Sequence, residues 1–190
     1  MSTLSEDYRT VLKQTHALMK KANGVGWGNT SAGPFYERIL DQIDRHGVTE
    51  LLDYGAGAGR LKAKLAEDRP HVIVHEFEPA RDDCCEPPEP CDFVVCNDVF
   101  EHVEPEYLAE FFKDLRRVVS DRGYFTVCMT PAKKVLPDGR NAHLIQKPYE
   151  WWLGKVATRF NIREAYHIDK LLPQGEFMVQ KQHPLPDYHK

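Results

Sequence analysis

The stretch Leu51-Leu52-Asp53-Tyr54-Gly55-Ala56-Gly57-Ala58-Gly59-Arg60-Leu61 decides the expected fold. An apolar run ends in an acid, three glycines follow at alternate positions, and an amphipathic helical pattern begins directly after them. Glycine lowers the stability of regular structure relative to alanine, so three at this spacing indicate that another group approaches the backbone closely. The stretch therefore predicts a strand, a tight glycine turn and a helix that form part of a ligand site.

The sequence around this stretch alternates between strand and helix patterns. Strands are predicted over residues 50–54, 71–77, 93–97 and 124–129, and helices over residues 60–67 and 104–119, with a turn at Asp121-Arg122-Gly123. Parallel strands need crossover connections, and alternating strands and helices supply them. The pattern predicts an α/β fold with a doubly wound, mostly parallel sheet and helices on both faces.

The two ends of the chain depart from this alternation. Helical spacing of apolar residues predicts helices over residues 4–21 and 34–46. The glycine-rich segment between them contains Trp27 and is interpreted either as a covering loop or as a connector packed on the core. After a predicted helix over residues 148–160, two strands over 161–168 and 176–180 have too few residues between them for a crossover helix. They are expected to be antiparallel, which gives the sheet an antiparallel end strand.

Composition indicates one globular domain. The 190 residues are 42% hydrophobic and 28% charged, which is typical of a folded domain of ordinary size. We expect a single domain over residues 1–190, in which residues 1–47 form N-terminal helices and a glycine-rich loop over the ligand site and residues 48–182 form the core. The five cysteines lack zinc-site spacing and are expected to be reduced thiols, with the Cys84-Cys85 pair as the only part with reactive character.

Charge and hydropathy exclude several classes of partner. The formal net charge of −4 provides no basic footprint for nucleic acid, which is therefore a disfavoured partner. No apolar run approaches the length of a membrane span, and the first residues are polar and acidic. We expect a soluble, cytoplasmic protein without a membrane partner, and no feature specifies an oligomeric state.

An acid lies at the end of the second predicted strand, as one does at the end of the first. Glu76 stands twenty-three residues after Asp53, and a carboxylate there can accept both hydroxyl hydrogens of a ribose. Glu78 is the rival for this role. Since an acid before the glycines repels a diphosphate and suits a cation, the combination favours a positively charged ligand that contains adenosine.

The segment Asp53-Tyr54-Gly55-Ala56-Gly57-Ala58-Gly59 resembles the motif that ends the first strand of class I S-adenosylmethionine-dependent methyltransferases. Glu76-Phe77-Glu78-Pro79 is similar to the acidic motif of that family, and residues 91–103 are similar to its fourth-strand segment. The resemblance covers residues 48–182 and implies a Rossmann-like core with S-adenosylmethionine as cofactor. The cofactor-binding residues that it implies are Asp53, Gly55, Gly57, Gly59, Glu76, Asn97, Asp98 and Val99. Between Pro79 and Cys91 there is little room for a third strand and helix, so this region is expected to be shortened.

The resemblance also implies the reaction. Methyl transfer needs an acceptor held in line with the methyl group, and a base where the acceptor must lose a proton. His102 and His143 are the candidate catalytic residues, with capping and loop hydrogen bonding as the structural alternative. Arg140 and Asp138, in the long polar loop over residues 130–143, are candidates for binding substrate. We expect an enzyme that methylates the oxygen, nitrogen or carbon of a small molecule, without a metal.

Two alternatives stay open. Asp98-x-x-Glu101-His102 with His143 resembles the metal-binding pattern of the small-RNA 3′-end 2′-O-methyltransferases, and it implies metal-assisted methylation of RNA ends. Against it, an Asp stands where that family has Glu, and the chain lacks an obvious RNA surface. The other alternative is a non-enzymatic protein that binds S-adenosylmethionine, for example as a regulatory subunit, although the presence of Asp53 and Glu76 argues against this.

Overall fold

The computed structural model describes residues 2–24, 26–28, 33–169 and 173–182. Its helices are α1 (Glu6–Asn23), α2 (Tyr36–His46), α3 (Arg60–Asp68), α4 (Leu108–Val118) and α5 (Tyr149–Ala157), with short 3-10 helices η1 (Phe100–His102) and η2 (Pro105–Tyr107). Its strands are β1 (Glu50–Tyr54), β2 (Ile73–Phe77), β3 (Cys91–Asn97), β4 (Val119–Cys128), β5 (Phe160–Ile168) and β6 (Gln174–Lys181). No helix among these residues combines the length and apolar character needed to cross a membrane.

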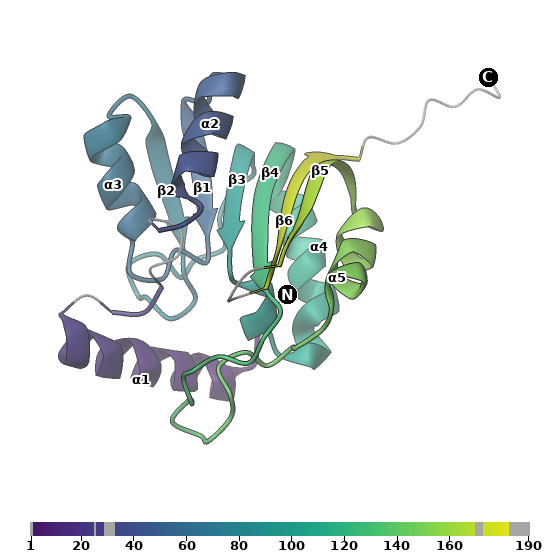
Figure 1. Cartoon of the computed structure of the whole chain (residues 1–190). Helices are drawn as coiled ribbons and strands as arrows, with labels where there is room; N and C mark the ends of the chain where they lie inside the picture. The colour runs from purple at the N-terminus through teal and green to yellow at the C-terminus, as the bar shows by residue number, and fades with distance from the viewer. Residues whose placement is uncertain (1, 25, 29–32, 170–172, 183–190) are drawn as a thin grey trace.

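The six strands form one sheet in the order β2-β1-β3-β4-β6-β5 (Figure 1). The pairs from β2 to β4 are parallel, while β6 is antiparallel to both β4 and β5. The predicted α/β fold, with a mostly parallel sheet and an antiparallel strand toward one end of it, is confirmed. That strand lies between β4 and β5 rather than at the edge of the sheet. Residues 78–90, all described, contain no strand, so the shortened third-strand region is also confirmed.

Helices cover both faces of the sheet, with α2 and α3 on one face and α4 and α5 on the other (Figure 1). Side chains alternate along β3, so that Phe93 and Val95 pack with the α2 and α3 residues. Val94 and Cys96 pack with the α4 and α5 residues. Because both faces are buried, the strand is apolar almost throughout, as is usual for a parallel sheet.

Helix α1 joins neither layer and crosses the end of the sheet (Figure 1). The Ser5 side chain caps this helix by accepting a hydrogen bond from the Tyr8 backbone N–H at 3.0 Å. Ser5 Oγ also donates to the Glu104 carboxylate at 2.8 Å, and the Tyr8 hydroxyl donates to the His102 carbonyl oxygen at 2.7 Å. These bonds fasten α1 over the segment that follows β3.

The turn predicted at Asp121-Arg122-Gly123 is wrong, because these residues lie inside β4. A Cβ at position 123 would lie 2.5 Å from the ring of Phe125 and 3.1 Å from the side chain of Val179. The glycine therefore leaves room for neighbouring side chains on the sheet, and it does not end the strand.

Candidate active site

A cavity of about 450 Å³ opens between α1 and the ends of β1, β3 and β4. This volume is within the usual range of roughly 300–1,000 Å³ for small-molecule sites. Most of its lining comes from α1, the Trp27–Gly28 segment, the turns after β1, β2 and β3, and the loop after β4. In an α/β sheet of this type, the carboxyl ends of the strands are where ligands bind.

The glycine turn after β1 is shaped by other segments of the same chain. Gly55 has φ +88°, and a Cβ there would lie 2.4 Å from the side chain of Val99. Gly57 has φ +53°, and a Cβ there would lie 2.7 Å from the carbonyl oxygen of Trp27. An L side chain is strained in this backbone region, so glycine is required on both counts. The sequence predicted that another group approaches the glycine backbone closely. At these two positions that group is part of the protein itself, Val99 at Gly55 and Trp27 at Gly57, and both residues line the cavity.

The two acids at the end of β2, Glu76 within the strand and Glu78 directly after it, have different surroundings. Glu76 forms ion pairs with Arg81 at 3.2 Å and with Lys62 at 3.6 Å, and it is absent from the described lining of the cavity. Its Oε1 atom is also the atom that a Cβ at Gly59 would meet, at 2.6 Å. The structure therefore uses Glu76 to hold the outer side of the glycine turn.

Glu78 lines the cavity, in contrast to Glu76. Its carboxylate accepts hydrogen bonds from the backbone N–H groups of Gly57 at 2.9 Å and Ala80 at 3.1 Å. His16 Nε2 on α1 lies 4.0 Å from the same carboxylate. Two N–H donors fix the carboxylate beside the glycine turn, which favours Glu78 over Glu76 as the acid that meets a ribose there.

Asp53 lies beneath the glycine turn and is absent from the described cavity lining. The residue is 1% exposed, and its Oδ2 atom has no hydrogen-bond partner among the described residues. Burial raises the pKa of the Asp53 carboxyl to about 8, with further contributions from the charges of Glu76 and Glu78. The folded protein therefore holds a proton on Asp53 at neutral pH.

This raised pKa predicts that stability falls as the pH rises. The unfolded chain releases the Asp53 proton at its ordinary pKa near 4, whereas the folded protein keeps it up to about pH 8. The contribution of this group is therefore complete below about pH 4 and is lost between about pH 4 and pH 8. The free energy of unfolding in urea, measured without ligand, is expected to fall for the parent protein between pH 5 and pH 8 relative to that of Asp53→Asn. If the difference between variant and parent is the same at pH 5 and at pH 8, the raised pKa of Asp53 is contradicted.

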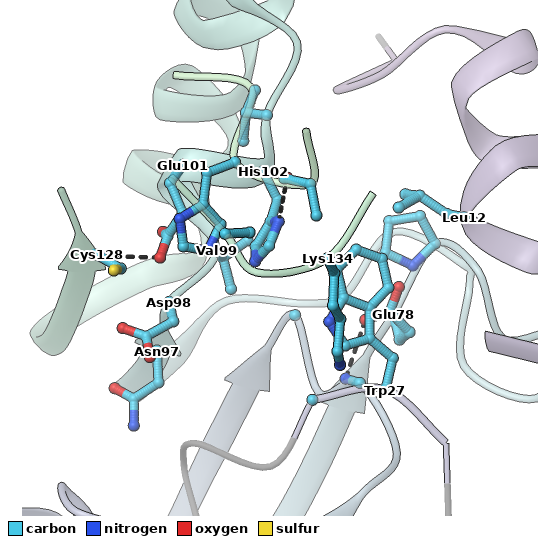
Figure 2. A pocket seen from close by; sticks show the side chains of 18 of the residues that line it. Leu12, Trp27, Glu78, Asn97, Asp98, Val99, Glu101, His102, Cys128 and Lys134 are labelled. Carbon is cyan, nitrogen blue, oxygen red and sulfur yellow. Dashed lines mark hydrogen bonds between the residues drawn. The ribbon is translucent and has the colours of Figure 1, made fainter. Parts of the chain in front are cut away.

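The turn after β3 forms the opposite wall of the cavity, where Figure 2 shows Asn97 and Asp98. Asp98 has φ +51°, a conformation that costs energy for any residue other than glycine. The hydroxyl of Thr126 donates to Asp98 Oδ1 at 2.7 Å, and the Asp98 backbone N–H donates to the Thr126 carbonyl oxygen at 3.1 Å. β4 thus stabilises the strained turn and directs it toward the cavity.

The two predicted catalytic histidines meet in the cavity, with ring centroids 4.9 Å apart. His102 Nδ1 donates to the Ala142 carbonyl oxygen at 2.6 Å, and His143 Nδ1 donates to the Thr130 carbonyl oxygen at 2.5 Å. In a neutral imidazole, this leaves each Nε2 atom as a hydrogen-bond acceptor. Burial, together with the nearby His143, lowers the pKa of His102 to about 3. His102 therefore stays neutral and accepts a proton poorly, which makes His143 the better candidate for a base.

A buried acid lies beside His143. Glu101 is fully buried; its Oε1 accepts a hydrogen bond from the Cys128 backbone N–H at 2.8 Å, and its Oε2 has no partner among the described residues (Figure 2). Burial raises the pKa of the Glu101 carboxyl well above its ordinary value. Ligand atoms of Glu101, Cys128 and His143 lie within 4.8 Å of one another.

This arrangement differs from the four-residue metal pattern of the sequence. Among the described residues, the group with metal-like spacing contains Glu101 and His143 but neither Asp98 nor His102. Cys128 completes the group, and the sequence did not predict it as a site residue.

Arg140 and Asp138 pair with each other rather than lining the described cavity. Arg140 Nη2 lies 2.7 Å from Asp138 Oδ2, and the guanidinium carbon lies 5.0 Å from the centroid of the Tyr8 ring. The Arg140 side chain also reaches Glu104 at 4.0 Å. The structure thus assigns this pair to fastening the loop after β4 onto α1 and gives no support for the predicted contact with substrate.

Sequence reasoning also missed two contributions of α1 to the cavity. Leu12 and His16 line it, at positions four and eight residues after Tyr8. Residues four apart share one face of a helix, so this spacing could have identified them. Trp27, whose role the sequence left open, lines the cavity with its ring centroid 5.0 Å from that of His102.

Comparison with known proteins identifies the class. A family model described as a methyltransferase domain matches residues 27–182. The chain therefore belongs to this methyltransferase family, and its identification from sequence as a class I methyltransferase is confirmed. No curated protein matches the chain.

Solved structures share the fold at low sequence identity. The 1,6-didemethyltoxoflavin-N1-methyltransferase of Burkholderia thailandensis, with its acceptor and S-adenosylhomocysteine bound, is 16% identical with a TM-score of 0.61 over 93% of this chain and 90% of that one. Magnesium protoporphyrin IX methyltransferase from Synechocystis, with S-adenosylhomocysteine, is 15% identical with a TM-score of 0.60 over 93% and 98%. The N-methyltransferase NodS from Bradyrhizobium japonicum, also with S-adenosylhomocysteine, is 15% identical with a TM-score of 0.58 over 89% and 99%.

Proposed function

We propose that the chain binds S-adenosylmethionine in this cavity and transfers its methyl group to a small-molecule acceptor. One observation carries the proposal: a single cavity connects the glycine turn and the Asn97–Val99 turn with His102 and His143. The solved relatives with S-adenosylhomocysteine bound support the choice of donor. Two of them act on compounds of small-molecule size, 1,6-didemethyltoxoflavin and magnesium protoporphyrin IX, which supports the class of acceptor.

The donor would lie along the glycine turn. Glu78, held by the N–H groups of Gly57 and Ala80, would accept hydrogen bonds from the ribose hydroxyls. Glu78, Asp98 and Glu101 are the carboxylates of the described cavity lining, and a sulfonium and an ammonium group suit such acidic surroundings. The bound donor supplies the activated methyl group.

The acceptor would lie under α1, next to the two histidines. His143 Nε2 would take a proton from an acceptor that must lose one, while His102, which stays neutral, would accept a hydrogen bond and orient it. Trp27 and the inner face of α1 would keep bulk water away from the reacting atoms. Proximity and alignment supply most of the rate enhancement in a transfer of this kind.

Calorimetric titration of the purified protein with S-adenosylmethionine tests the donor site, and a complete lack of binding would refute the proposal. Glu78→Gln is expected to weaken this binding by about 10- to 100-fold, because a hydrogen bond to a charged group contributes about 1.5–3 kcal/mol. Glu76→Gln, which removes the same charge outside the described cavity lining, is expected to change the affinity by less than about threefold. If Glu76→Gln instead weakens binding more than Glu78→Gln does, the ribose contact belongs to Glu76. Thermal unfolding of both variants verifies that they are folded.

Enzymatic turnover separates this proposal from a purely binding role. Incubation with S-adenosylmethionine and an extract of small metabolites is expected to release S-adenosylhomocysteine, with a product heavier by one methylene group in the mass spectrum. Binding of the donor without any such product would favour the non-enzymatic alternative.

A further inference from the structure

A basic and aromatic cluster lies on the α1 side of the cavity, formed by Lys134, Trp27 and His16 (Figure 2 shows Lys134 beside Trp27). The Lys134 Nζ atom is 5.7 Å from the centroid of the Trp27 ring. The ring centroid of His16 lies 5.8 Å from that of the same indole. The methyl-transfer scheme above assigns no role to Lys134, although it comes from the same loop as His143.

Lys134 is one of two lysines in the described cavity lining, with Lys133, and its surroundings differ from those of the acids there. Each of the acids accepts hydrogen bonds from protein donors: Glu78 from Gly57, Asp98 from Thr126 and Glu101 from Cys128. Lys134 makes no ion pair within the described parts of the chain, and partial desolvation lowers the pKa of its ammonium group. Contact with the face of Trp27 places this cation without neutralising it, because a cation–π contact leaves the formal charge intact.

We propose that Lys134 and Trp27 select an acceptor that is a planar aromatic acid. The Lys134 ammonium group would pair with its carboxylate, and the Trp27 indole would contact its ring. This inference rests on the proposed function, since it names the class of acceptor for the same cavity. It also suits the chemistry, because a negative charge on the acceptor attracts the sulfonium donor and both charges lie in a partly dry site.

The amino-acid carboxylate of the donor is the rival partner for Lys134. The position of Lys134 favours the acceptor, because the loop after β4 carries both Lys134 and His143 and brings both side chains to the cavity. Lys134 also influences the titration of both His102 and His16, which places its charge among the histidines. Of these two, His102 belongs to the proposed acceptor site, whereas His16 lies 4.0 Å from Glu78 on the donor side.

Two matched probes test the proposal. Protein saturated with S-adenosylhomocysteine is titrated with 1-naphthoate and with 1-naphthamide, which share a ring system and differ in charge. We expect the naphthoate to bind at least about tenfold more tightly. Lys134→Gln is expected to remove this preference, whereas Lys155→Gln, the same charge change outside the described cavity lining, keeps it. Trp27→Leu is expected to weaken the binding of both probes to a similar degree.

Three results would overturn the proposal: equal binding of the two probes, no saturable binding of the naphthoate, or a preference that survives Lys134→Gln. A loss of S-adenosylhomocysteine affinity of about tenfold in Lys134→Gln, with the probe preference intact, would assign the lysine to the donor carboxylate instead. If the parent protein does not bind S-adenosylhomocysteine at all, the proposed function fails. The naphthoate preference, measured on the unliganded protein, then still tests Lys134.

Discussion

Replacing His143 by alanine is expected to lower kcat by about two to three orders of magnitude, because a positioned base contributes about 10²–10⁴-fold to proton transfer. The affinity for S-adenosylmethionine should stay within about threefold, since the described contacts place His143 beside His102 and Glu101 rather than on the glycine turn. The measurement is the release of S-adenosylhomocysteine with the acceptor that the parent protein methylates.

The matched control is His143→Asn. The asparagine amide can still donate to the Thr130 carbonyl oxygen, as His143 Nδ1 does, but it has no basic nitrogen. If the histidine acts as a base, both variants are equally slow. Activity restored by asparagine would show that His143 only holds its loop, which is the structural role left open by the sequence.

Gly57→Ala is expected to lower the free energy of unfolding by about 1–3 kcal/mol through backbone strain, with an added cost from collision. Its φ is +53°, and a Cβ would lie 2.7 Å from the backbone oxygen of Trp27, which has little freedom to move aside. For a chain of this size, each kcal/mol lowers Tm by roughly 2–4 °C. Thermal unfolding without ligand measures the effect directly.

Gly139→Ala provides the comparison for this variant. Gly139 has φ +88°, but nothing lies within 4 Å of the position that its Cβ would take. It should therefore show the backbone strain without the collision, and a smaller loss of stability than Gly57→Ala. Equal losses in the two variants would mean that the contact with Trp27 contributes nothing.

The fold could be predicted largely because its signals are local. The apolar runs at 50–54 and 93–97, with helical spacing after each, mark strands of a parallel sheet, and both strands are present. Gly123 misled the prediction because a glycine that ends a strand and one that makes room for Phe125 have the same appearance in a sequence. Only the neighbouring strands distinguish the two.

The site could be predicted less completely, because its details depend on which way side chains point. The sequence places Glu76 and Glu78 two residues apart, and only the structure shows that the first meets Arg81 while the second faces the cavity. The sequence predicted that Arg140 binds substrate because a guanidinium group suits a carboxylate. In the structure, the carboxylate that Arg140 meets is that of Asp138. His143 and His102 were expected near the ligand because one lies in a long loop and the other follows a predicted strand, where ligand contacts concentrate, and both line the cavity.

The order β4-β6-β5 in the sheet has a consequence for synthesis on the ribosome. β5 leaves the ribosome before β6, yet it has no place in the sheet until β6 has paired with β4. Until then, the edge of β4 stays open beside buried residues such as Phe125 and Val127, which are fully covered in the finished protein. An open apolar edge promotes aggregation of nascent chains. The final strand therefore acts as a closing step on which both the sheet and the protection of its interior depend.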